Sequence, residues 1–159
     1  EQTATCPSCP VIVPLFRSFD SAKNDHLYTS TPNELVTSSP GYTTEGVAAG
    51  IFPTQVGQST PFFRLYDDGL GHHAYTINTT EVQAFLAAGY VLETTPGYVY
   101  ATGICGSVPL YRMFLASRND YFYTTSAGER NTAISEGYAD QGIAAYVQVP
   151  GIIGGDTAC

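Results

Sequence analysis

Three arginines recur in the same short sequence context, and their planar guanidinium groups suit the binding of sugar hydroxyls or of a carboxylate. The spacing is 47 residues from Arg17 to Arg64 and 48 residues from Arg64 to Arg112. Each arginine follows a proline by three positions and precedes a tyrosine by eleven. A period of this length, held along the whole chain, predicts three related structural units.

Acidic, imidazole and phenol side chains occupy equivalent positions near the repeated tyrosines. A flat ring for the C–H face of a pyranose, beside an acceptor for its hydroxyls, is what a sugar site needs. We expect these acidic and ring side chains to be exposed next to loops, with simple packing of the strand as the alternative. The predicted sugar-binding residues are Arg17, Asp25, His26, Arg64, His72, His73, Arg112, Asp120 and Tyr121.

The repeated arginines also have a structural interpretation. Each arginine can pair with a glutamate of its own unit or of the next and so hold a strand to a helix. The candidate partners are Glu34, Glu45, Glu81, Glu93 and Glu129. A structural role must be met in every unit, whereas a ligand site can degenerate in one, so the structural role is favoured. For Tyr28, Tyr75 and Tyr123 we predict buried positions with satisfied hydroxyl groups.

Metal binding and catalysis are the less favoured chemistries. Asp67, Asp68, His72 and His73 lie within seven residues, but their spacing matches no EF-hand and no helical histidine motif. Carboxylates recur at equivalent positions, so no unique acid and base emerge, and there is no Gly-x-Ser-x-Gly sequence. We therefore expect no metal, no cofactor and no enzymatic activity.

Composition narrows the class of partner. The chain has 159 residues and a net charge of −8, which opposes association with nucleic acid or with an anionic membrane. No apolar run approaches the ~20 residues that span a bilayer. The chain begins at Glu1 rather than Met, and we interpret it as a mature product whose leader has been removed.

Cysteines and a glycosylation sequence point to the outside of a cell. Cys6, Cys9, Cys105 and Cys159 lie outside the repeated phrase and predict two structural disulfides. Three pairings are possible, and we favour Cys6 with Cys159 and Cys9 with Cys105. Asn78 opens an Asn-Thr-Thr sequon, a glycosylation site if the source is eukaryotic.

Each unit is expected to run strand, strand, helix, strand. Alternating aromatic segments predict first strands at 15–19, 62–66 and 110–114, each followed by a turn-rich loop and a second strand. Helices are predicted at 81–88 and 129–136, before Gly89 and Gly137, with a single distorted turn at 34–40. The expected N-caps are Thr31, Thr79 and Ser126. Thr94 and Pro96 predict a different bend in the last strand of the middle unit.

The predicted organisation is a single domain over 1–159. It comprises an arm at 1–10, units at 11–57, 58–105 and 106–150, and a tail at 151–159. Such units cannot bury their apolar faces alone, so they must share a core. We predict an α+β fold of three ββαβ units around a pseudo-threefold axis, with a linear solenoid as the alternative.

The repeated phrase resembles a short secreted module found in fungi and bacteria. The match rests on PLFR, DHLYTS and GYTTEGVAAGIF in the first unit and on PLYR, DYFYTTS and GYADQGIAAYV in the third. The module often stands as a domain of unknown function appended to cell-wall or carbohydrate-active enzymes, and some mushroom members are regarded as lectins. The resemblance implies a non-catalytic, extracellular, sugar-binding module.

These observations together predict a secreted, lectin-like protein whose partners are glycans or cell-wall polysaccharide. Nucleic acid and membrane insertion are not expected, and the oligomeric state, a homo-oligomer included, stays open. A structural or protein-binding cell-wall protein is the second hypothesis, and a small secreted hydrolase is the third.

Overall fold

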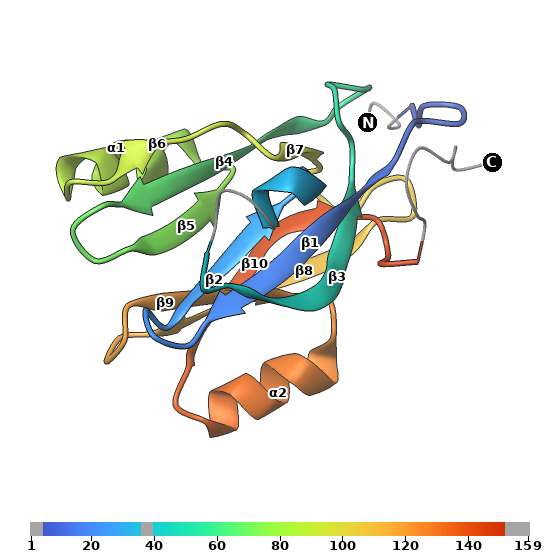
Figure 1. The fold of residues 1–159 in the computed structure, drawn as a ribbon. Coiled ribbons are helices and arrows are strands. Elements are labelled where there is room, and N and C mark those ends of the chain that lie inside the picture. The colour runs from blue at the N-terminus through green and yellow to red at the C-terminus, as the bar shows by residue number, and fades with distance from the viewer. Residues whose placement is uncertain (1–4, 36–39, 152–159) are drawn as a thin grey trace.

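The chain folds into three small antiparallel β-sheets with two short helices on their outer sides (Figure 1). This arrangement comes from a computed structural model that describes residues 5–35 and 40–151. The predicted β-rich class with short helices is confirmed.

The first and third sheets share one arrangement, an antiparallel hairpin with another strand on the far side of its first strand. The first sheet has the order β2-β1-β3, from β1 (Val13–Asp20), β2 (Asp25–Thr29) and β3 (Thr43–Ile51). The third has the order β10-β8-β9, from β8 (Val108–Leu115), β9 (Asp120–Thr124) and β10 (Ala139–Val147). The hairpins lie where the alternating aromatic segments predicted them.

The second sheet differs on one side of its hairpin. It consists of β4 (Thr60–Asp67), β5 (His72–Thr76), β6 (Val91–Leu92) and β7 (Gly97–Val99). Both β6 and β7 pair with β4, and residues 93–96 between them form no strand. This confirms the bend predicted from Thr94 and Pro96. At Gly97 a Cβ would lie 2.5 Å from the carbonyl oxygen of Phe52, so only glycine permits this backbone contact.

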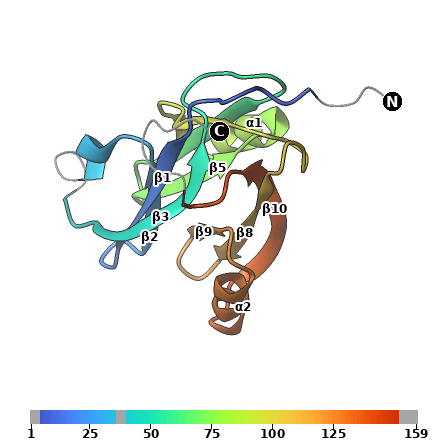
Figure 2. The same ribbon diagram turned by 90° about the vertical axis from the view of Figure 1, so that its right-hand side faces the viewer.

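Two helices follow the second strands of the second and third units. They are α1 (Thr79–Ala87) and α2 (Ala127–Ser135), and they lie on different sides of the molecule (Figure 2). Gly89 and Gly137 follow the helix ends with φ near +100°, as predicted for C-terminal glycines. No helix in the described part of the chain is long and apolar enough to cross a membrane.

The N-caps correct one prediction and confirm another. Ser126 caps α2 as expected, but α1 is capped by Asn78, whose side chain accepts from the backbone N–H groups of Thr80 and Glu81. Thr79 was the wrong residue because asparagine also caps well and stands one position earlier. In the first unit residues 32–35 are helical, with Thr31 accepting the backbone bond from Glu34; the rest of the predicted turn at 36–39 lies outside the described residues.

Three tyrosines from different units meet in the core. Tyr28, Tyr75 and Tyr123 are each at most 1 % exposed, and their ring centroids are 5.2–5.4 Å apart. Their hydroxyls donate in a cycle to backbone oxygens, Tyr28 to Tyr123, Tyr123 to Tyr75 and Tyr75 to Tyr28, at 2.6–2.8 Å. Each hydroxyl also accepts a backbone N–H of the cycle at 2.6–2.8 Å. The predicted core role of the tyrosines is confirmed.

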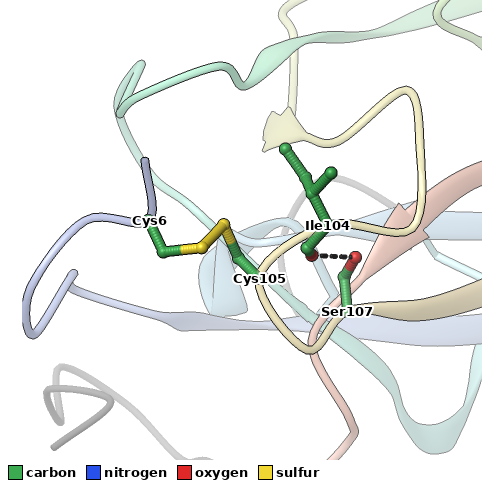
Figure 3. Close-up of a disulfide and its surroundings, with 4 residues drawn as sticks. All are labelled: Cys6, Ile104, Cys105 and Ser107. Atoms are coloured by element: carbon green, nitrogen blue, oxygen red, sulfur yellow. Dashed lines mark hydrogen bonds between the residues drawn. A yellow bond between two sulfur atoms is a disulfide. The ribbon is translucent and has the colours of Figure 1, made fainter. Parts of the chain in front are cut away.

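A disulfide joins the N-terminal arm to the loop before β8 (Figure 3). Cys6 is bonded to Cys105, with Cα atoms 5.5 Å apart. The favoured pairings of Cys6 with Cys159 and of Cys9 with Cys105 were therefore both wrong, because the arm brings Cys6 to this loop. Cys9 is not free, and Cys159 lies outside the described residues.

Candidate functional site

Arg17 lies on β1 opposite Tyr28 and binds two glutamates from different units. Its Nη1 and Nη2 donate to the carboxylate of Glu129 at 2.8 and 2.9 Å, and its Nε donates to Glu45 at 2.8 Å. Burial opposes the charge on Arg17, but hydrogen bonding to Glu129 and attraction to its anionic neighbours outweigh it and raise the pKa. The guanidinium is therefore a cation that two carboxylates hold in place.

Arg64 repeats this geometry in the second unit. Its Nη1 and Nη2 donate to Glu34 at 2.6 and 2.8 Å, and its Nε donates to Glu93 at 3.0 Å. The side chain of Arg64 is only 8 % exposed. The two carboxylates therefore take up the donors on both edges of this guanidinium.

Arg112 keeps only half of the arrangement. Its Nη1 and Nη2 donate to Glu81 at 2.6 and 2.8 Å. Gln141 stands at the position that Glu45 and Glu93 hold in the other units, and Nε of Arg112 has no hydrogen-bond partner among the described residues. The Nε edge of the Arg112 guanidinium thus has no acceptor among the described residues.

The structural interpretation of the arginines is confirmed with one correction. The glutamate that follows each helix start pairs with an arginine of a different unit, as Glu34 does with Arg64. The arginine of each unit binds the glutamate of the preceding unit, not that of its own unit or the next as predicted. For Arg17 of the first unit, this partner is Glu129 of the third unit. These pairs hold neighbouring units together.

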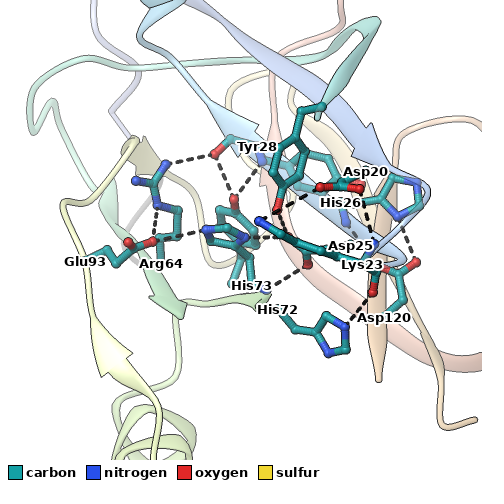
Figure 4. A network of polar contacts seen from close by, with 12 residues as sticks. Asp20, Lys23, Asp25, His26, Tyr28, Arg64, His72, His73, Glu93 and Asp120 are labelled. Atoms are coloured by element: carbon teal, nitrogen blue, oxygen red, sulfur yellow. Dashed lines mark hydrogen bonds and ion pairs between the residues drawn. The ribbon is translucent and has the colours of Figure 1, made fainter. Parts of the chain in front are cut away.

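The first unit meets the second through a buried acid and imidazole (Figure 4). His73 Nδ1 donates to Asp25 at 2.6 Å, and its Nε2 lies 3.3 Å from Glu93. Asp25 is fully buried and also accepts from the hydroxyl of Tyr42 at 2.6 Å. Burial disfavours the cation, but hydrogen bonds to Asp25 and Glu93 outweigh it and raise the pKa of His73.

The third unit meets the first through the same chemistry. His26 Nδ1 donates to Asp120 at 2.8 Å, and its Nε2 lies 3.4 Å from Glu45. Tyr138 donates its hydroxyl to Asp120, which is fully buried. Burial of His26 opposes protonation, but hydrogen bonds to Asp120 and Glu45 raise its pKa to about 9.

The second unit meets the third without an acid–imidazole pair. His72 stands where the other units have aspartate, and its Nδ1 lies 3.2 Å from Nδ2 of Asn119 in the third unit. Tyr121 stands where they have histidine, and its ring lies edge-on to Phe85 of the second unit, with ring centroids 5.8 Å apart. Besides the ion pair of Arg112 with Glu81, this contact therefore consists of ring contacts and hydrogen bonds of Asn119.

The predicted exposure of these side chains was wrong. Asp25 and Asp120 are fully buried, and His26, His72 and His73 are 7–8 % exposed. They flank loops along the sequence, but the packing of one unit on the next covers them.

Three surface pockets each contain one of the arginines. The first, of about 180 Å³, is lined by Arg17, His26, Glu45, Phe122, Glu129 and Tyr138, with residues of α2 and Glu136. The second, of about 300 Å³, is lined by Lys23, Glu34, Tyr42, Arg64, Tyr66, His73 and Glu93, with Leu27 and Pro40. The third, of about 350 Å³, is lined by Thr76, Asn78, Glu81, Arg112, Gln141 and Ile143, with Ile77, Ala101 and Ala144.

The candidate metal ligands of the second unit have other partners. His73 binds Asp25, His72 binds the backbone of Lys23, and Asp67 accepts from the N–H groups of its own loop. Within residues 5–35 and 40–151, no cluster of three or more His, Cys, Asp or Glu is placed to hold a metal ion.

Sequence reasoning assigned no role to the tyrosines that follow the helix-ending glycines. Tyr42 and Tyr138 bind the two buried aspartates, and Tyr90 accepts a hydrogen bond from Asn119 at 3.1 Å. Their recurrence in every unit was a signal that could have identified them as part of the contacts between units.

The family described as Domain of unknown function (DUF5648) matches residues 13–148. The chain belongs to this family. No curated protein and no solved structure matches the chain. The resemblance to a module of unknown function is confirmed, and the DUF5648 match covers all three arginines. Since the family description names no ligand, the functional argument rests on the geometry of the pockets.

Proposed function

We propose that this DUF5648 protein is a secreted, non-catalytic carbohydrate-binding protein of the lectin type. The observation that carries the proposal is the combination of aromatic rings with arginine-bound carboxylates in the first and second pockets. Phe122 and Tyr138 line the first pocket, and Tyr42 and Tyr66 line the second. A ring offers a flat apolar face to the C–H patch of a pyranose, and a carboxylate accepts from its hydroxyls.

The carboxylates, rather than the arginines, are placed to contact the sugar. The side chains of Glu45 and Glu129 are 34 % and 40 % exposed, against 11 % for Arg17. The hydrogen bond from Arg17 lowers the pKa of Glu129 and keeps it ionised at neutral pH. The arginine fixes the acceptors in place, which reduces the entropy lost on binding.

The predicted imidazole and aspartate residues then act through the carboxylates of the pockets. Nε2 of His26 lies 3.4 Å from Glu45, and Asp120 orients the ring through Nδ1. In this proposal Asp25, His26, His73 and Asp120 position the acceptors and do not touch the sugar.

We further infer that the three units surround a pseudo-threefold axis. The cyclic hydrogen bonds of Tyr28, Tyr75 and Tyr123 support this closed arrangement over a linear one, because the last unit bonds back to the first. Related pockets on one body would allow weak sites to act together on a multivalent glycan.

An extracellular location is supported by the disulfide between Cys6 and Cys105. Asn78 is exposed, and its Oδ1 caps α1, so the Nδ2 that glycosylation modifies is not needed for the cap. The proposal therefore includes use of this sequon in a eukaryotic host.

A structural or protein-binding role is the second candidate. It is favoured by the pairing of Arg17, Arg64 and Arg112 with glutamates of neighbouring units, since this is what a scaffold without a ligand also requires. A blank glycan array would leave this candidate in place.

A small hydrolase is the third candidate, because the first pocket holds Glu45, Glu129 and Glu136 from non-equivalent positions. A glycosidase needs one carboxyl group that stays protonated near neutral pH. Hydrogen bonds from His26 and from Arg17 instead lower the pKa of Glu45 and of Glu129. Neither of these two groups is thus suited to serve as the acid.

A glycan array, followed by titration of one bound neutral glycan in two-dimensional NMR, tests the proposal. We expect shifts at backbone amides around the first or second pocket, and loss of those at the second pocket in Tyr66→Ala. Leu86→Ala, an exposed position on α1, is the control and should bind normally. No binding to any glycan, or binding unaffected by changes in either pocket, would refute the lectin proposal.

A further inference from the structure

The third pocket differs from the other two because its arginine, Arg112, has a hydrogen-bond donor without an acceptor among the described residues. Nε of Arg112 is buried and has no hydrogen-bond partner among residues 5–35 and 40–151. A buried donor without an acceptor is unfavourable, so an acceptor brought by a ligand would gain a desolvated, charge-assisted hydrogen bond.

The other two units show which group fits beside this Nε. A carboxylate oxygen of Glu45 lies 2.8 Å from Nε of Arg17, and one of Glu93 lies 3.0 Å from Nε of Arg64. In the third unit the equivalent residue is Gln141, which carries no charge and is exposed. In the first two units a carboxylate therefore lies beside Nε of the arginine, and in the third unit this position has no carboxylate.

An incoming carboxylate is also less strongly repelled beside Arg112 than beside the other two arginines. Each of the other pockets already holds two carboxylates bound to its arginine, whereas this one holds only Glu81. Thr76 and Gln141 line the wall and offer uncharged polar groups. At about 350 Å³ this pocket is also larger than the first and second.

We propose that the third pocket binds the carboxylate of an acidic sugar, a uronic acid, with the carboxylate taking the place of the missing glutamate beside Nε of Arg112. This inference rests on the proposed glycan-binding function and names the ligand class of one site. Nε has almost no exposed surface, so entry requires a side-chain movement in the wall of the pocket, which Arg112 and Gln141 both line. The net charge of −8 repels polyanions, so a single uronic residue in a largely neutral glycan is the expected ligand.

The test compares methyl β-D-glucuronide with methyl β-D-glucoside by NMR of the arginine Nε–H signals. The glucuronide should shift the Arg112 signal and bind about tenfold more tightly than the glucoside at this pocket, the size of one charge-assisted hydrogen bond. Gln141→Glu fills the position with the side chain that the other units use, and should abolish this preference. Binding of neutral glycans at the first and second pockets should not change.

Glu45→Gln is the matched variant, because it gives Arg17 the same free Nε and should create a second response to glucuronide. If neutral glycans bind but glucuronide shows no preference for Arg112, or if its binding survives Gln141→Glu, the acidic-sugar site is refuted and the lectin proposal stands. If glucuronide shifts Arg112 while no neutral glycan binds, the third site stands and the proposal for the other two pockets falls. If nothing binds in any form of the protein, both proposals fall.

Discussion

The contacts that the first unit makes with its two neighbours differ from the contact between the second and third units. Both contacts of the first unit contain a buried aspartate, an imidazole and an arginine bound to two glutamates, as in the set around Asp120 and His26. The contact between the second and third units has His72, Tyr121 and an arginine bound to one glutamate. The same strand position thus carries either an imidazole bound to a buried aspartate or the ring of a tyrosine.

The difference shows that a buried acid–imidazole pair is not needed at every contact between units. Tyr28, Tyr75 and Tyr123 form the same pair of hydrogen bonds at all three places, whether or not an acid–imidazole pair lies outside them. Buried ion pairs contribute little net stability relative to apolar packing, although breaking one is costly. We expect the two contacts with an acid–imidazole pair to be more sensitive to mutation and to pH than the contact without one.

The largest difference is expected from removal of the buried carboxylates. Asp120→Asn and Asp25→Asn each remove the buried counter-ion of an imidazole and leave only the half-exposed Glu45 or Glu93, so each should destabilise the protein by about 3 kcal/mol. His72→Asn at the equivalent position removes no counter-ion and should cost about 1 kcal/mol. Urea denaturation of the three variants measures this, and equal losses would contradict the division into contacts with and without an acid–imidazole pair.

A second effect is the dependence of stability on pH. The folded pKa of His26 is about 9, against about 6.5 for an unfolded histidine. Because the folded pKa is raised, the stabilisation is complete below pH 6.5 and is lost as the pH rises through 9. The loss should reach at most about 3 kcal/mol for this residue.

His73 has its pKa raised in the same direction and adds to this effect. Thermal melts between pH 6 and pH 9.5 should show a falling midpoint for the natural sequence. His26→Gln, combined with His73→Gln, should give a lower but flatter profile. A profile of the double variant as steep as that of the natural protein would rule out these two imidazoles as the source.

Local features of the fold could be predicted from the sequence. The helix ends at Gly89 and Gly137, the hairpins, and the break before β7 follow from residues that act on their own backbone. The buried tyrosines were predicted because the same aromatic residue recurs at one strand position in every unit.

Features that depend on contacts between units could not be predicted in the same way. Asp25 and His26 stand next to a polar loop and look exposed, and only the packing of the neighbouring unit buries them. The spatial order of the units decides which unit supplies the glutamate bound to the Nη atoms of each arginine, and the path of the arm decides the pairing of Cys6 with Cys105. Single-sequence patterns carry no information on that order.

Tyrosine-to-phenylalanine changes test the part that the three contacts share. Tyr28→Phe, Tyr75→Phe and Tyr123→Phe each remove one hydroxyl that donates to a carbonyl and accepts from an N–H group. Each should cost about 2 kcal/mol, since a buried backbone N–H is left unpaired. Similar losses in denaturant melts are expected from a closed, pseudo-threefold arrangement, and one harmless variant among the three would argue against it.

The smallest expected effect is an increase in the free energy of unfolding. Gln141→Glu gives Nε of Arg112 the partner that Glu45 and Glu93 give to the other arginines, and it should raise the free energy of unfolding by about 0.5 kcal/mol. The gain is small because position 141 is exposed and because the chain is already acidic. It should disappear below the pKa of the new carboxylate and shrink in about 1 M salt, whereas Gln141→Ala should show neither trend. A gain that persists at pH 3 would mean that glutamate acts here through packing, and the difference between the third contact and the other two would then not be one of charge.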